Sequence, residues 1–154
     1  MDRFDPVLGR DLSDRKYRFA LDIVITVWQR HDGTPIWELR KLGNSLFNGR
    51  HKTVIKSYQP TQEENFIKII QTLANGTFDS NTFKVCLENF TNIYKPKQYS
   101  EARFVKFCST IAFLGIFFSQ KSAASRGIDM AVDIIISLLS DVLSRGTLRQ
   151  SSWS

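Results

Sequence analysis

The residues that could carry chemistry are few and do not assemble into a recognisable catalytic motif. The stretch GNSLFNGR, residues 43–50, is bracketed by glycines, but a phosphate-binding loop needs four residues between its glycines, followed by Lys and Ser or Thr. Here five residues intervene and Arg50-His51 follow. His31 and His51 are the only histidines; neither has Cys or acidic residues at metal-ligand spacing, and both are expected at the surface or at helix caps. No nucleophile elbow or catalytic carboxylate pair occurs, so neither an enzyme nor a metal or cofactor site is expected.

Length and composition indicate one folded, basic domain. The 154 residues suffice for a single core, and the excess of Lys and Arg gives a net charge of +6. Basic residues are spread along the chain and cluster only in short pairs such as Arg15-Lys16, so nucleic-acid or nucleocapsid-type binding is an alternative function rather than the preferred one. A self-associating structural domain is a third. Cys86 and Cys108 lie in apolar helical patterns, which predicts buried, reduced thiols and an intracellular protein.

Apolar periodicity and the prolines divide the chain into helices, and no strand pairs with turn chemistry occur. Helices are expected over about residues 13–31 and from about 36 towards 58, with a break at QPTQEE. Further helices begin at about 61, 79 and 101, and the last covers 127–146. The predicted fold class is therefore an all-α bundle formed by one domain over residues 1–154.

The segment at about residues 101–119 differs from the others because it is apolar nearly all round. Only Lys106, Ser109 and Thr110 interrupt it between Phe104 and Phe118. An all-round apolar helix too short to cross a bilayer is typical of the buried centre of a folded domain. We therefore predict a central hydrophobic helix surrounded by amphipathic ones, and no transmembrane anchor.

The segment LRKLGNSLFNG, residues 39–49, places a glycine within a helical apolar pattern. A glycine inside a helix costs about 1 kcal/mol relative to alanine, so either a neighbouring backbone approaches closely or the helix tolerates the cost. The segment resembles the death motif, the third homology region, of the Bcl-2 family. Asn44 stands where the family usually has Asp. The residues that carry this resemblance are Leu39, Leu42, Gly43, Asn44 and Leu46.

The segment YSEARFVKFCSTIAFLGIFF, residues 99–118, resembles the family's first homology region, which opens its buried central helix. Arg103 matches the arginine of that motif, Ala102 replaces its glycine, and its Asn-Trp pair is absent. Ser100 is expected to cap the helix. Trp153 is the sole candidate for the second homology region and lacks the flanking glycines. The short first connection and the missing anchor resemble compact viral members of the family.

The resemblance implies a Bcl-2-like bundle that regulates apoptosis, as a pro-survival protein acting in a host cell. Its partners would be the amphipathic death-motif helices of pro-apoptotic Bcl-2 proteins, held in a hydrophobic groove, with Arg103 paired to the ligand's aspartate. It further implies a cytoplasmic monomer or homodimer, peripheral to mitochondria, without stable membrane insertion. Taken individually, each apolar groove residue is better explained by a core position than by a groove. By the family's layout, the groove residues are Leu46, Val54, Phe66, Ile70, Phe83, Leu87, Phe90, Ala102, Arg103 and Phe104.

Overall fold

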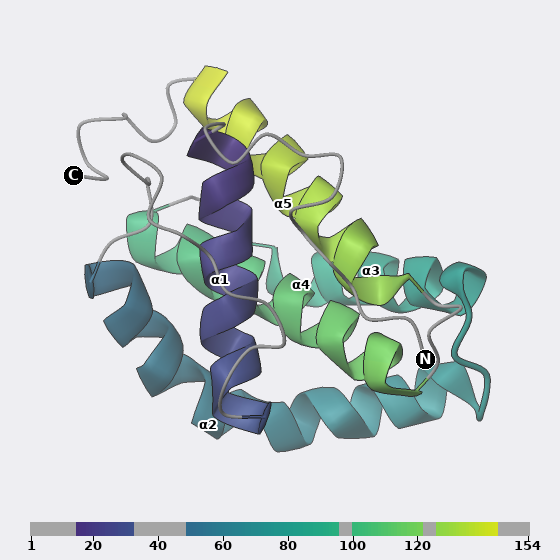
Figure 1. Cartoon of the computed structure of the whole chain (residues 1–154). Helices are drawn as coiled ribbons and strands as arrows, with labels where there is room; N and C mark the ends of the chain where they lie inside the picture. The colour runs from purple at the N-terminus through teal and green to yellow at the C-terminus, as the bar shows by residue number, and fades with distance from the viewer. Residues whose placement is uncertain (1–14, 33–48, 96–99, 122–125, 145–154) are drawn as a thin grey trace.

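The computed structural model describes residues 15–32, 49–95, 100–121 and 126–144, and all regular structure within these ranges is α-helical (Figure 1). The predicted all-α class is confirmed for this part of the chain. The death-motif-like segment, including Leu46, and Trp153 lie outside the described residues. The helices are α1 (Arg15–Asp32), α2 (Gly49–Ala74), α3 (Ser80–Tyr94), α4 (Glu101–Lys121) and α5 (Gly127–Ser144).

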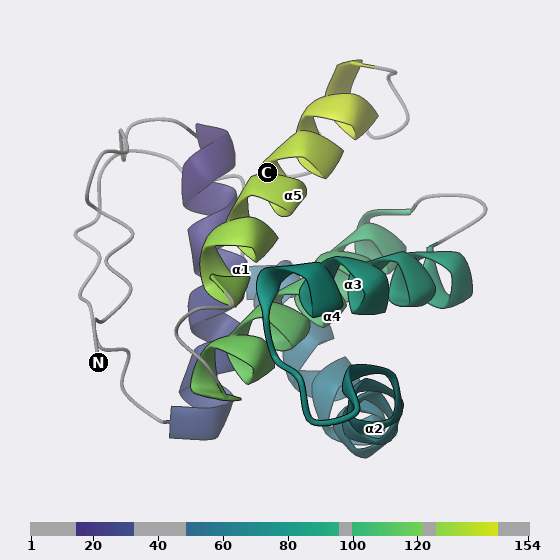
Figure 2. The same ribbon diagram turned by 90° about the vertical axis from the view of Figure 1, so that its right-hand side faces the viewer.

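Helix α4 forms the centre of the bundle, as its apolar sequence predicts. It contacts each of the other four described helices, and 13 of its 21 residues are buried. Figure 2 shows α1 and α5 on one side of α4 and α2 and α3 on the other. The hydroxyl oxygen of Ser100 accepts a hydrogen bond from the backbone N–H of Arg103 at 3.2 Å, which confirms the predicted cap.

The expectation that the α4 segment is too short to cross a membrane is wrong on length. Among the described residues it is the one helix that is long and apolar enough for a span by length and composition. Most of its apolar surface is nevertheless enclosed by the other helices, with 78% of its most apolar stretch buried. An all-round apolar pattern of this kind is also what the core helix of a bundle requires.

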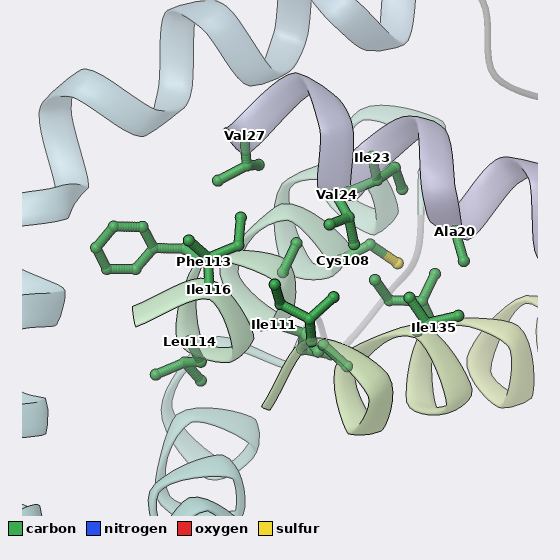
Figure 3. Close-up of a cluster of buried hydrophobic side chains, with 14 of the residues drawn as sticks. Ala20, Ile23, Val24, Val27, Cys108, Ile111, Phe113, Leu114, Ile116 and Ile135 are labelled. Carbon is green, nitrogen blue, oxygen red and sulfur yellow. The ribbon is translucent and has the colours of Figure 1, made fainter. Parts of the chain in front are cut away.

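On one side of α4 the packing against α1 and α5 is apolar and close. Figure 3 shows aliphatic side chains of α1 directed toward α4 and toward Ile135 of α5. Where α4 crosses the start of α5, Gly115 faces Gly127, and a Cβ on Gly115 would lie 2.6 Å from the Gly127 carbonyl oxygen and 2.7 Å from Cβ of Ala131. The two backbones are therefore in contact, and only glycine fits at this crossing.

Helix α2 contradicts the predicted break at QPTQEE, because it continues through Pro60. Proline removes one hydrogen bond and costs about 3 kcal/mol inside a helix. Pro60 lies on the exposed face, and the hydroxyl of Thr61 donates to the carbonyl oxygen of Tyr58 at 2.7 Å. Packing on both sides of the proline offsets the cost. The buried positions recur every three or four residues: His51, Ile55, Gln59, Glu63, Phe66, Ile70 and Ala74.

Helix α3 is the peripheral member of the bundle and packs against α2 and α4. It begins where the sequence predicts, because the carboxylate of Asp79 accepts a hydrogen bond from the backbone N–H of Thr82 at 2.8 Å. This bond lowers the pKa of Asp79. The inward face of α3 consists of Phe83, Cys86 and Phe90, each fully buried.

Candidate functional site

One stripe of α4 leads from the predicted arginine to the contact between α2 and α3. Arg103, Lys106, Thr110 and Phe113 follow one another at intervals of three or four residues, so their side chains share one face of the helix. Arg103 and Lys106 are exposed, whereas Thr110 and Phe113 are buried. The stripe therefore runs from solvent at the start of α4 into the packed interior.

At its buried end the stripe meets α2 next to the contact between α2 and α3. The ring of Phe66 on α2 packs against that of Phe113 at 5.7 Å and against that of Phe90 on α3 at 5.4 Å, measured between centroids. Both distances fall in the range of favourable aromatic pairs. We call the region where α2, α3 and this stripe meet the α2–α3 seam. It comprises Val54, Tyr58, Phe66, Leu87, Phe90, Arg103, Lys106, Thr110 and Phe113.

At its open end the α2–α3 seam combines positive charge with aromatic and apolar surface. Lys106 Nζ lies 5.7 Å from the centroid of the Tyr58 ring, within the distance of a cation–π interaction. The Tyr58 hydroxyl lies 3.5 Å from Oγ1 of Thr110, which places the ring beside the stripe. Val54 and Leu87 are half-buried against the core. An exposed cation thus lies beside an aromatic ring that remains partly accessible.

Beneath the seam, the contact between α2 and α4 is polar. Gln59 Nε2 donates to Ser109 Oγ at 2.9 Å, although both side chains are buried. The hydroxyls of Ser109 and Thr110 both donate to the carbonyl oxygen of Lys106, at 2.8 and 3.0 Å. Gln59 Oε1 is buried and has no hydrogen-bond partner among the described residues. Since a buried polar atom without a partner costs free energy, this contact is less favourable than an apolar one of the same area.

A second polar contact joins the first turns of α2 and α4. His51 Nε2 lies 2.6 Å from Oε1 of Glu101, and a guanidinium nitrogen of Arg50 lies 3.3 Å from the same oxygen. The His51 side chain is 1% exposed and meets Phe19 of α1 edge to face. Burial lowers the pKa of His51 from its ordinary value of 6.5, although the hydrogen bond to Glu101 acts in the opposite direction. The expectation of a surface or capping histidine is wrong for His51.

The structure separates the predicted groove residues into three environments. Val54 and Leu87 are half-buried, Ala102 and Arg103 are exposed, and Leu46 lies outside the described residues. The remaining members are fully buried and pack in the core: Phe66, Ile70, Phe83, Phe90 and Phe104.

Two of the predicted groove residues lie away from the seam. The ring of Phe104 stacks on that of Phe19 at 6.3 Å and so faces α1. The ring of Phe83 meets that of Phe118, near the far end of α4, at 5.3 Å. The contact of Phe66 with Phe90 occupies the place where the groove was predicted, so α2 and α3 are closed on each other there.

Sequence reasoning did not identify Tyr58, Lys106 or the His51–Glu101 pair. The i, i+3 spacing of Arg103 and Lys106 was visible in the sequence, but Lys106 was interpreted only as an interruption of an apolar helix. The partners of Tyr58 and His51 are about fifty residues away in the chain, and no local pattern indicates them.

In the parts of the chain that the structure describes, no group of three or more His, Cys, Asp or Glu side chains could hold a metal ion. No protein-family model, curated protein or solved structure matches this chain. Function is therefore inferred from the α2–α3 seam itself.

Proposed function

We propose that this protein is a Bcl-2-like, pro-survival regulator of apoptosis that binds the death-motif helix of a pro-apoptotic Bcl-2 protein at the α2–α3 seam. The observation that carries this proposal is the stripe on α4, where an exposed arginine in the first turn leads directly to an aromatic contact between two other helices. An arginine at this place corresponds to the arginine of the family's first homology region, which this segment resembles. It would pair with the aspartate of the ligand's death motif.

Arg103 does not stabilise α4 through the helix dipole. The N-terminus of a helix carries partial positive charge, so a cation in the first turn is slightly unfavourable. A guanidinium at this position instead supports a role toward a carboxylate outside the helix, because its planar fork can form two parallel hydrogen bonds with one carboxylate.

The apolar part of the ligand helix would lie along the rest of the seam. An amphipathic helix docks through residues at i, i+3 or i+4, and i+7, and it needs apolar surface at matching intervals. Val54 and Tyr58 on α2 and Leu87 on α3 offer partly accessible apolar surface. Deeper insertion requires Phe66 and Phe90 to separate. Because α3 packs against α2 and α4, an outward movement of α3 leaves the contacts among α1, α4 and α5 in place.

Nucleic-acid binding is the second candidate, and the charge on α2 is the observation that favours it. Arg50, Lys52 and Lys56 are exposed on the first half of α2, and Arg103 and Lys106 are exposed on the adjacent start of α4. Binding through such a patch would be independent of a helical peptide. It would weaken steeply as salt rises, because it depends on the release of counterions.

A double-mutant cycle tests the proposed function. We expect Arg103→Ala to weaken binding of a synthetic death-motif peptide by about tenfold, or about 1.4 kcal/mol. Replacing the peptide's aspartate by alanine should cost a similar amount, and the two changes together should cost little more than either alone.

Lys121→Ala, at the exposed far end of the same helix, is the matched control and should leave the affinity unchanged. Thermal unfolding of both variants checks that the fold is retained. Absence of saturable binding at ordinary salt, or full additivity in the cycle, would contradict the proposed role of Arg103.

A further inference from the structure

We infer that the α2–α3 seam recognises two acidic residues of its ligand helix, spaced one helical turn apart, with Lys106 as the second cation beside Arg103. This inference rests on the proposed function and specifies the charge pattern of its ligand. It assigns a binding role to the one lysine that interrupts the apolar sequence of α4 between Phe104 and Phe118.

The spacing of the two cations sets the spacing of the acids. Residues at i and i+3 on a helix have Cβ atoms about 5–6 Å apart. Arg103 and Lys106 have this relation and are both exposed. Two carboxylates on a docked helix reach two such cations at once when the carboxylates are three or four residues apart, because that is the spacing of neighbours on one helix face.

The position of the Lys106 ammonium group is defined by the seam. It lies over the ring of Tyr58, whose hydroxyl is within 3.5 Å of Thr110 on the same stripe of α4. The hydroxyls of Ser109 and Thr110 donate to the carbonyl oxygen of Lys106. A cation–π contact at an exposed site is worth only about 0.5–1 kcal/mol, so the ammonium group stays available to a carboxylate while remaining beside α2.

Glu101 is the acidic residue in the first turn of α4. The carboxylate of Glu101 is held by His51 and Arg50, at the contact between α2 and α4 that also includes Phe19 of α1. Exposed Lys52 and Lys56 on α2 add further positive charge. A ligand with two acids on one face matches this surface, whereas a ligand with a single acid offers no carboxylate to Lys106. An ion pair between Lys106 and the second acid therefore favours death-motif helices that carry this acid over helices that lack it.

A peptide series with matched lysine variants tests the inference. Four synthetic death-motif peptides keep the aspartate and carry either Glu or Gln one turn before it or one turn after it. We expect one of the Glu peptides to bind the wild-type protein about fivefold more tightly than its Gln counterpart. This preference should disappear in Lys106→Gln. It should persist in Lys121→Gln, whose lysine also lies over a ring, that of Phe117, at 5.3 Å.

The possible failures are distinguishable. If the wild type does not discriminate Glu from Gln at either position, or if Lys106→Gln keeps the full preference, the inference is overturned. The proposed function still stands in that case, provided that the coupling between Arg103 and the peptide's aspartate is observed. If none of the four peptides binds saturably, both the inference and the proposed function are overturned.

Discussion

The two sides of α4 are packed by different means. Toward α1 and α5 the contacts are apolar, with the ring of Phe104 stacked on that of Phe19 beside aliphatic side chains, and at Gly115 and Gly127 the helix backbones themselves touch. Toward α2 the middle of the contact is a hydrogen bond between Gln59 and Ser109, and toward α3 the ring of Phe118 meets that of Phe83. At the crossing of α4 and α5 the backbones leave no room for a side chain, whereas toward α2 and α3 the contacts are made by side chains that can separate.

This difference indicates which side can serve binding. A close-packed interior has low compressibility and resists deformation. The α1–α4–α5 side is therefore suited to maintaining the fold. Polar groups such as those of Gln59 and Ser109 regain hydrogen bonds to water when they separate, so opening the α2 side costs less than opening an apolar interface of equal area. Local stability should therefore be lower around the α2–α3 seam.

The largest effect is expected for Gly115→Leu at the crossing of α4 and α5. Any side chain there meets the Gly127 carbonyl group and Ala131, so we expect a loss of about 3 kcal/mol in the free energy of unfolding, measured by urea denaturation. Gly49→Ala is the control: a Cβ on Gly49 meets no atom within 4 Å, and its effect should stay within about 0.5 kcal/mol. Equal effects of the two substitutions would show that the crossing is not closely packed.

A smaller effect is expected from pH at His51. Burial lowers the pKa of His51 from 6.5, so the folded protein binds this proton less tightly than the unfolded chain does. The stability that the neutral ring contributes is present above pH 6.5 and is lost as the pH falls from there toward the lowered pKa. Urea midpoints should therefore fall between about pH 7.5 and about pH 5.5 in the wild type. The urea midpoint of the His51→Gln variant should fall less over the same pH range. An identical decrease in both proteins would contradict a buried, neutral His51.

The smallest effect is expected for Gln59→Met beneath the seam. The substitution removes a hydrogen bond to Ser109, but it also removes the buried Gln59 Oε1 atom that has no partner, and Ser109 keeps its bond to the Lys106 carbonyl. We expect a change of less than about 1 kcal/mol in the free energy of unfolding. Ile55→Ala, one turn earlier on the same buried face, should cost about 2–5 kcal/mol. A comparable loss in Gln59→Met would mean that the polar contact stabilises α2 as strongly as an apolar one.

The α1–α4–α5 side was the more predictable from sequence. The apolar run from Phe104 to Phe118 indicates a buried helix whatever its neighbours are, and Ser100 marks its start. The contact of Gly115 with Gly127 was not predictable, because a single glycine in each segment acquires its role only when the two helices cross.

The α2 side was less predictable because its buried face is partly polar. His51, Gln59 and Glu63 occupy buried positions that a hydrophobic pattern assigns to solvent, and Pro60 was interpreted as a break in a helix that is continuous. Arg103 was selected by resemblance. The contact of its neighbour Lys106 could not be predicted, because it is made with the ring of Tyr58 from another helix.

The two cysteines allow the most direct test of the difference between the two sides. They are the only cysteines in the chain; Cys86 lies on α3 and Cys108 on α4 facing α1, and both are fully buried. Desolvation raises the pKa of Cys86 to about 11 and raises that of Cys108 well above its ordinary value. At about pH 8, alkylation of either thiol therefore requires local or global opening of the fold.

The measurement is the alkylation rate of each cysteine, followed by mass spectrometry, with and without a saturating death-motif peptide. If the α2–α3 side opens locally and binds the peptide, Cys86 should be alkylated at least about tenfold faster than Cys108. The peptide should then slow the alkylation of Cys86 more than that of Cys108. Equal rates for both thiols in the free protein, or a peptide that protects them equally, would show that the two sides open together and would contradict the account.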